Sequence, residues 1–319
     1  MIRIVFFGTE LFATEILRAL FAMKDATVVG VITQPARRVG RKQELHSSPV
    51  SQLAAEANAL CLEPATLKSE DIQRSLQEFN ADIFIVAQYG LIIPQAILSI
   101  PHYGALNVHT SLLPLYRGAS PVQSAIAAGE IATGITIMCM DAQLDHGSIL
   151  TQYPAQISPT DTTPTLMARL AAIGSAHIGE VITQFVAGSL TPQPQIEALA
   201  TFTKLLSRED GFVDFKTETA TSVERKIRAL TPWPGVTIAI GDLNVKLLSA
   251  SVMAAANQVA DRAPGALHIS EDRVFFATYS GTLEVLTLQP AGKSVMTAAN
   301  FARGYKHLTG TTAVQPQKL

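Results

Sequence analysis

The chain has few of the residues on which several classes of protein depend. Only two of its 319 residues are cysteines, Cys61 and Cys139, and neither has a Cys or His nearby at metal-ligand spacing. We therefore expect both thiols to be reduced residues of the core, with no disulfide framework and no metal site. No apolar run approaches the roughly 20 residues that a membrane-spanning helix needs, so we expect no association with a membrane.

Charge is also sparse. Charged residues make up 16% of the chain and hydrophobic residues 48%, with a net charge of -2, which is typical of a globular rather than a disordered protein. The first predicted strand begins at Ile2, which leaves no room before it for a signal or transit peptide, so we expect a cytoplasmic location. The length allows two domains.

The glycine-rich turn of a dinucleotide-binding fold is missing. A single glycine, Gly8, follows the first predicted strand, whereas that fold needs three glycines in the spacing G-x-G-x-x-G. The three glycines let a pyrophosphate approach the start of the helix. Their absence argues against a nicotinamide-dependent oxidoreductase.

Short β-branched runs alternate with helical patterns over the first part of the chain. This alternation predicts an α/β fold with a Rossmann-like, mostly parallel sheet. The predicted strands cover residues 2–7, 28–33, 83–87, 105–108, 133–140 and 149–155. The predicted helices cover residues 10–22, 48–58, 70–79, 121–128 and 163–186.

A proline-rich connection containing Pro192 and Pro194 follows the long helix and can continue neither a helix nor a central strand. We therefore place a catalytic domain at residues 1–188, a linker at 189–206 and a second domain at 207–319. The second domain has five short strands at hairpin-like spacing, which predict a small OB-like β-barrel of a kind often used to hold nucleic acid. These strands cover residues 236–240, 245–252, 266–269, 274–278 and 283–288.

Three polar residues are the candidates for chemistry. Asn107 and His109 stand two residues apart at the end of a predicted strand, so their side chains point to the same side. Asp145 follows the strand at 133–140, and in a parallel sheet its loop should open on the same edge. An amide and an imidazole can stabilise an oxyanion while a carboxylate helps to remove a proton from an attacking amine, which suits acyl transfer.

Structural roles remain possible for the same residues. Asn107 could cap a turn, His109 could be a hydrogen-bonded histidine of the core, and Asp145 could belong to the turn before Gly147. Asp141 competes with Asp145 for the role of the carboxylate, and the sequence separates the two only weakly.

These motifs resemble the signature of folate-dependent formyltransferases. The resemblance lies in Asn107-Val-His109, in Ser111-Leu-Leu-Pro114 with Arg117-Gly-Ala, and in Leu144-Asp145-x-Gly147. Other segments resemble the members of this family that act on methionyl-tRNA. They are Phe7-Gly8-Thr9, Thr33-Gln34-Pro35, Ser48-Pro49-Val50, Tyr89-Gly90-Leu-Ile-Ile-Pro94, Thr136-Ile137-Met138 with Met140-Asp141, and Pro232-Trp233-Pro234-Gly235.

The resemblance implies a reaction and a site. It implies that Asn107, His109 and Asp145 are catalytic, that 10-formyltetrahydrofolate donates the formyl group, and that the α-amino group of methionyl-initiator tRNA accepts it for translation initiation. It implies neither a metal ion nor an obligatory protein partner. The residues that it places in the folate pocket are Tyr89, Gly90, Leu91, Ile92, Pro94, Ser111, Leu112, Leu113 and Pro114.

A basic run lies early in the chain, at Arg37, Arg38, Arg41 and Lys42, with no acidic residue between Asp25 and Glu44. The resemblance implies that this loop contacts the tRNA acceptor stem, where basic side chains would bind phosphates without selecting bases. A solvated charged loop is the alternative. The loop departs from the family pattern in having Ala36 for an acidic residue, Arg38 for Pro, Lys42 for Gly and Ser47 for Pro.

Two other functions fit parts of this pattern. One is a folate-dependent formyltransferase that acts on an amino-sugar nucleotide or a ribonucleotide amine, because Pro-Trp-Pro-Gly also occurs in some enzymes for sugar nucleotides. The other is a non-catalytic RNA-binding protein that uses the barrel alone. The acceptor that is formylated distinguishes the first from methionyl-tRNA formylation, and RNA binding without folate turnover would identify the second.

Overall fold

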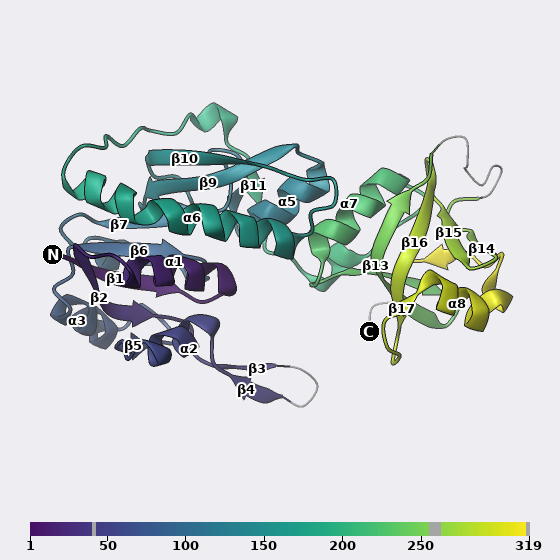
Figure 1. The fold of residues 1–319 in the computed structure, drawn as a ribbon, viewed down its shortest axis with the longest axis horizontal. Helices are drawn as coiled ribbons and strands as arrows, with labels where there is room; N and C mark the ends of the chain where they lie inside the picture. The colour runs from purple at the N-terminus through teal and green to yellow at the C-terminus, as the bar shows by residue number, and fades with distance from the viewer. Residues whose placement is uncertain (40–42, 255–262, 317–319) are drawn as a thin grey trace. The chain divides into compact units, whose positions relative to one another are not determined.

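A computed structural model describes residues 1–39, 43–254 and 263–316 (Figure 1). The chain forms two compact units. The first unit comprises Met1–Pro121, Ala132–Gln156 and Met167–Lys204, and the second comprises Val122–Ile131, Ile157–Leu166 and Leu205–Leu319. The domain limits at residues 188 and 207 stay a prediction. None of the helices in the described ranges is long and apolar enough to cross a membrane.

The first unit is built on a mostly parallel sheet, as predicted. Within the described ranges its strands follow the order β10-β9-β7-β6-β1-β2-β5. The strands are β1 (Ile2–Gly8), β2 (Ala26–Ile32), β5 (Cys61–Leu62), β6 (Ile83–Ala87), β7 (Ala105–His109), β9 (Ala132–Cys139) and β10 (Ile149–Gln156). Five neighbouring strands, β7, β6, β1, β2 and β5, run parallel to one another. β9 is antiparallel to both β7 and β10.

The direction of β9 corrects one prediction. His109 lies opposite Thr136 and Leu106 lies opposite Cys139, so β9 ends beside the beginning of β7. The loop after β9 therefore does not open on the edge where β7 ends, as we had expected for parallel neighbours. Asp145 reaches β7 by another route, because its loop turns back toward the strand.

Helices cover both faces of this sheet (Figure 1). They are α1 (Leu11–Phe21), α2 (Pro49–Glu56), α3 (Glu70–Glu78), α4 (Gln95–Leu98) and α6 (Thr163–Val186). On one face, Phe7 and Phe84 belong to a buried cluster with Leu76 of α3 and Ile97 of α4. On the other face α6 approaches α1 and β7. The strand residues are buried on both sides, which explains their continuous hydrophobic runs.

The second unit contains a nearly closed antiparallel barrel, which confirms the predicted fold class. Its elements are α5 (Pro121–Ala128, from Val122 on), α7 (Ala220–Leu230), β12 (Val236–Ile240), β13 (Leu243–Val252), β14 (Leu267–Ser270), β15 (Arg273–Ala277), β16 (Thr282–Pro290), β17 (Met296–Thr297), α8 (Ala298–Tyr305) and β18 (Ala313–Val314). Backbone hydrogen bonds from Leu267 to Thr311 and from Ala313 to Gly265 bring the two edges of the sheet together. The stacked rings of Phe215 and Phe276 lie in its core.

Two short strand pairs were not predicted. β3 (Arg37–Val39) and β4 (Glu44–His46) form an antiparallel hairpin that carries part of the basic run. β8 (Arg117–Gly118) pairs with β11 (Phe202–Thr203), which lies in the segment predicted as a linker. This segment also contains a short 3-10 helix, Glu197–Leu199. It is therefore paired with the first unit and is not a free connection.

Substitution of Phe84 tests the assignment of the core beneath the sheet. It is fully buried, and its ring lies 5.1 Å from that of Phe7. We expect Phe84→Ala to lower the free energy of unfolding by about 3–5 kcal/mol, because it removes buried apolar surface and leaves a cavity. Urea unfolding measures this change. Leu60→Ala is the control, because Leu60 is 60% exposed, and its effect should stay within about 0.5 kcal/mol. Equal effects would contradict the assignment of the core.

Candidate active site

The three predicted polar residues come together in the first unit. Asn107 Nδ2 donates a hydrogen bond to Asp145 Oδ1 at 3.3 Å, and His109 Nδ1 lies 3.6 Å from Asp145 Oδ2. The side chains of His109 and Asp145 are only 7% and 12% exposed. An amide, an imidazole and a carboxylate thus share one small, largely buried site at the end of β7.

A second hydrogen bond holds the carboxylate of Asp145. The backbone N–H of Gly118 donates to Asp145 Oδ2 at 2.8 Å. Asp145 itself has a positive φ of 47°, which is uncommon for a residue other than glycine. The carboxylate is therefore oriented from two sides, by the side chain of Asn107 and by the backbone at β8.

His109 lies between two acceptors. Its Nδ1 faces Asp145, and its Nε2 lies 3.2 Å from the carbonyl oxygen of Tyr116. A neutral imidazole has a single N–H and can donate to one of these oxygens, whereas the protonated ring can donate to both. Each ring nitrogen of His109 thus faces an oxygen, and an N–H of the ring can also stabilise negative charge that develops on a substrate oxygen.

The competing carboxylate, Asp141, has other partners. Its Oδ2 lies 2.6 Å from His146 Nδ1, and its Oδ1 accepts from the backbone N–H of Gln143 at 2.8 Å. Asp141 thus shapes the loop that carries Asp145, and Asp145 is the carboxylate beside Asn107 and His109. In the described ranges, no cluster of three His, Cys, Asp or Glu side chains could hold a metal ion.

The predicted folate residues lie on two neighbouring loops. β6 and β7 run parallel with Val86 opposite Asn107, so the loops that follow them open at the same edge of the sheet. Some of these residues belong to the core: Tyr89, Ser111 and Leu113 are buried. The others are exposed or half-buried, namely Gly90, Leu91, Ile92, Pro94, Leu112 and Pro114. Only these six present much of their surface to a ligand.

Tyr89 stands out among the buried members. Its ring meets that of Phe7 edge-on at 5.4 Å, and burial raises the pKa of Tyr89 to about 12. Its hydroxyl is buried without a hydrogen-bond partner among the described residues. Its carbonyl oxygen accepts from both Thr9 Oγ1 and Gln34 Nε2. The start of this loop is therefore held rigidly, and one buried polar atom remains free.

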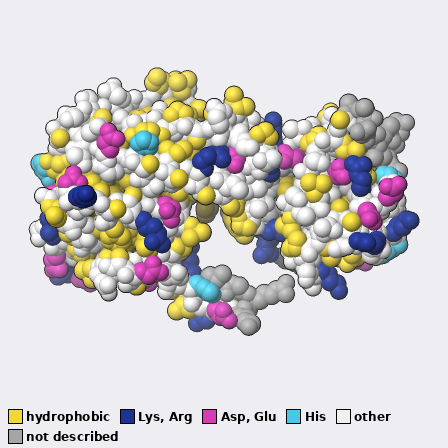
Figure 2. Space-filling model, in the orientation of Figure 1, with side chains coloured by type: hydrophobic (Ala, Val, Ile, Leu, Met, Phe, Trp, Pro, Cys, Tyr) yellow, Lys and Arg dark blue, Asp and Glu magenta, His cyan; other side chains and the backbone are white. Residues whose placement is uncertain are grey.

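Two residues of the predicted basic run, Arg37 and Arg38, lie on the β3–β4 hairpin, which carries basic, acidic and histidine side chains together (Figure 2). Arg37 and Arg38 are exposed, and Arg38 Nη1 donates to the carbonyl of Gln43 at 3.2 Å. Arg41 and Lys42 lie outside the described residues. Glu44, at the start of β4, lies 3.9 Å from His46. The described part of the hairpin is thus of mixed charge.

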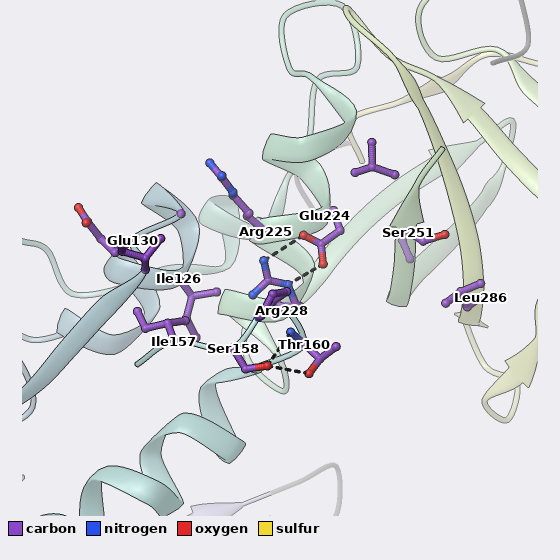
Figure 3. Close-up of a pocket in the computed structure, with 15 residues that line it drawn as sticks. Ile126, Glu130, Ile157, Ser158, Thr160, Glu224, Arg225, Arg228, Ser251 and Leu286 are labelled. Atoms are coloured by element: carbon purple, nitrogen blue, oxygen red, sulfur yellow. Dashed lines mark hydrogen bonds and ion pairs between the residues drawn. The ribbon is translucent and has the colours of Figure 1, made fainter. Parts of the chain in front are cut away.

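A large cavity, about 560 Å³, lies in the second unit and contains none of the predicted site residues (Figure 3). Its charged side chains bind one another: the guanidinium of Arg228 contacts both carboxylate oxygens of Glu224 and donates to the carbonyl of Asp161. Arg225 donates to the carbonyl of Ala128. The size of this cavity therefore does not mark it as the reaction site.

Comparison with known proteins identifies the family. The family model "Formyl transferase" matches residues 2–182, and "Formyl transferase, C-terminal domain" matches residues 205–306. The chain belongs to the formyl transferase family. The resemblance seen in the sequence motifs is thereby confirmed.

Individual proteins that are similar to this formyl transferase include two named relatives and one solved structure. A protein of Roseiflexus sp. (strain RS-1) named methionyl-tRNA formyltransferase is 42% identical over 96% of this chain and 93% of its own length. A protein of the same name from Marinobacter nauticus is 41% identical over 96% of this chain and 97% of its own length. A crystal structure of an N-formyltransferase from Helicobacter canadensis, in complex with folinic acid and dTDP-3-aminofucose, shares the fold. It has a TM-score of 0.65 and 18% identity, and covers 89% of this chain and 99% of that one.

One part of the site in this formyl transferase was missed by sequence reasoning. Arg117, only 2% exposed, forms two hydrogen bonds with Glu197 and two with Gln195. Both partners lie in the segment that we predicted to be a linker. Its prolines correctly indicated that a helix ends there, but no local pattern indicated that its polar side chains contact Arg117, in the segment that follows β7.

Proposed function

We propose that this chain transfers a formyl group from 10-formyltetrahydrofolate to the α-amino group of methionyl-initiator tRNA. The product is N-formylmethionyl-tRNA, which serves translation initiation. The observation that carries the proposal is the 42% identity, over 96% of the chain, to a protein named methionyl-tRNA formyltransferase. The convergence of Asn107, His109 and Asp145 supports it.

The proposed reaction assigns a role to each of the three residues. The lone pair of the amine attacks the formyl carbon and forms the new C–N bond, while the carbonyl electron pair moves to oxygen. Asn107 has a second amide N–H beyond the one bonded to Asp145, and together with His109 it donates to this oxyanion. Asp145 accepts the proton that the amine loses.

Collapse of the tetrahedral species completes the transfer. The carbonyl re-forms as the bond between the formyl carbon and N10 of the folate breaks. Asp145 gives the proton that it took from the amine to N10, so charge and atoms balance and the carboxylate is regenerated. No nucleophilic side chain is required, because the acceptor amine attacks directly.

The two loops beside Asn107, His109 and Asp145, which we call the trio, have surfaces that suit the folate. Leu91 and Ile92 offer apolar surface to a flat pterin, and Gly90 exposes backbone groups for hydrogen bonds. Pro94, Leu112 and Pro114 add the remaining wall. We assign Tyr89, Ser111 and Leu113 to the support beneath it, because their side chains are buried.

The acceptor tRNA requires a separate surface. Arg37 and Arg38 on the hairpin, together with Arg41 and Lys42 beyond its described part, would bind acceptor-stem phosphates. We also assign tRNA binding to the barrel, within a second domain at residues 207–319. Glu44 and His46 make the hairpin less uniformly positive than the sequence run alone indicates.

A formylation assay tests the proposed function. Purified protein is mixed with 10-formyltetrahydrofolate and charged initiator tRNA, and acid gels or mass spectrometry detect N-formylmethionine. Uncharged tRNA and an amino-sugar nucleotide are the controls. We expect product only with the charged tRNA, and formylation of the amino sugar alone would support the alternative function.

Substitution of the trio tests its roles. We expect Asn107→Ala and Asp145→Ala each to lower turnover by about a hundredfold or more while the fold stays intact, through loss of an oxyanion donor and of a base. Asp141→Ala is the matched control and should cost less than about tenfold, since Asp141 contacts His146 instead. Wild-type turnover in either trio variant, with circular dichroism unchanged, would overturn the assignment.

The salt dependence of tRNA binding tests the role of the basic run. We expect the quadruple replacement of Arg37, Arg38, Arg41 and Lys42 by Ala to weaken tRNA binding and to flatten the dependence of log Kd on log salt, because fewer counterions are released. Filter binding at several salt concentrations measures both. Unchanged binding at low salt would exclude this run from the tRNA surface.

A further inference from the structure

Gln195 makes four hydrogen bonds with its side-chain amide, all within the first unit. Its Nε2 donates to the carbonyl oxygens of Asp145 at 2.9 Å and Gly147 at 2.8 Å. Its Oε1 accepts from Arg117 Nε at 3.1 Å and Nη2 at 2.8 Å. Both donors and both acceptor sites of the carboxamide are thus used, and asparagine is the only other natural side chain with the same set of donors and acceptors.

These bonds close a ring around Asp145. Arg117 is connected to Asp145 in two ways: its side chain reaches the Asp145 backbone through Gln195, and the N–H of the next residue, Gly118, donates to the Asp145 carboxylate. Arg117 is held in turn by Glu197, whose two oxygens it contacts at 2.6 and 3.0 Å. The hydrogen bonds from Arg117 lower the pKa of Glu197, so this partner stays ionised at neutral pH.

The backbone of Asp145 needs such support. Its φ of 47° lies in the left-handed region, which residues other than glycine adopt rarely and keep where surrounding contacts impose it. Gln195 binds the carbonyl of this residue and that of Gly147, so it fixes the peptide groups on the turn. If those bonds were lost, the turn could relax and the carboxylate would move from Asn107 and His109.

We propose that Gln195 is a positioning residue, which holds the Asp145 carboxylate in place for the transfer of the formyl group. The segment from Gln195 to Thr203 is then a part of the active site, although it follows the long helix α6 and was predicted as a linker. The catalytic consequence rests on the proposed function, whereas the placement of Asp145 can be measured without it.

Replacement of Gln195 by Glu gives a sharp test. The two side chains have the same shape, and an ionised Glu still accepts hydrogen bonds from Arg117, but it has no N–H for the carbonyls of Asp145 and Gly147. Gln193→Glu is the matched control, because it makes the same chemical change two residues away on an exposed side chain that donates only to Thr191 among the described residues.

Steady-state kinetics should separate positioning from binding. We expect Gln195→Glu to lower kcat by about tenfold or more and to change KM for either substrate by less than about twofold, because an interaction that acts in the transition state is weakened. Gln193→Glu should keep both constants within about twofold of the wild type. An unchanged kcat in Gln195→Glu would overturn the proposal.

A double-mutant cycle tests whether Gln195 acts through Asp145. Residues that work as one unit are not additive, so Gln195→Glu should cause little further loss, less than about twofold, in the Asp145→Ala background. If instead the two losses multiply, Gln195 acts independently of Asp145 and the proposal fails.

Hydrogen exchange gives a readout without catalysis. The N–H of Gly118 is bonded to the Asp145 carboxylate, so its exchange should be about tenfold faster in Gln195→Glu than in the wild type or in Gln193→Glu. Unchanged exchange overturns the positioning role even if formylation is established.

The proposed function and the role of Gln195 can fail separately. A wild-type protein that does not formylate methionyl-tRNA refutes the proposed function, and the exchange result still decides the role of Gln195. If Gln195→Glu fails to fold, Gln195→Met serves in the same measurements.

Discussion

The carboxylate of Asp145 is the group on which the rest of the site depends. Both of its oxygens are engaged, one by Asn107 and the other by the backbone of Gly118, and His109 faces it at 3.6 Å. A largely buried carboxylate is costly unless it is hydrogen-bonded or paired with a cation. These contacts therefore stabilise the charge, and they also fix the orientation of the two groups that would act on the formyl oxygen.

Bringing Asp145 to that place constrains the loop after β9. Because β9 runs against β7, the chain has to turn back sharply after Cys139. Gly147 allows this turn, since a Cβ at that position would lie 1.9 Å from the carbonyl oxygen of Cys139. The sequence motif Leu-Asp-x-Gly thus combines the charged group with the residue that lets the backbone pass close to β9.

The same constraint explains the segment after α6. Pro192 and Pro194 end regular structure, but the residues that follow pair with the first unit through β11 and through the contacts of Gln195 and Glu197 with Arg117. A buried guanidinium requires several acceptors at once. Within the described part of the chain, Arg117 finds them in Gln195 and Glu197, which lie 78 and 80 positions later, so the first unit is not complete without this segment.

Much of the molecule was predictable from local patterns. Buried strands, amphipathic helices and the small barrel followed from hydrophobic periodicity, which depends on neighbouring residues. Asn107 and His109 could be paired because strand geometry sets the direction of side chains two residues apart. Local patterns did not give the direction of β9 or the contacts of Gln195, and they separated Asp145 from Asp141 only weakly, so that the choice of Asp145 came from the resemblance to the family. Each depends on contacts between residues distant in sequence, and such contacts are set only when the strands take their order in the sheet.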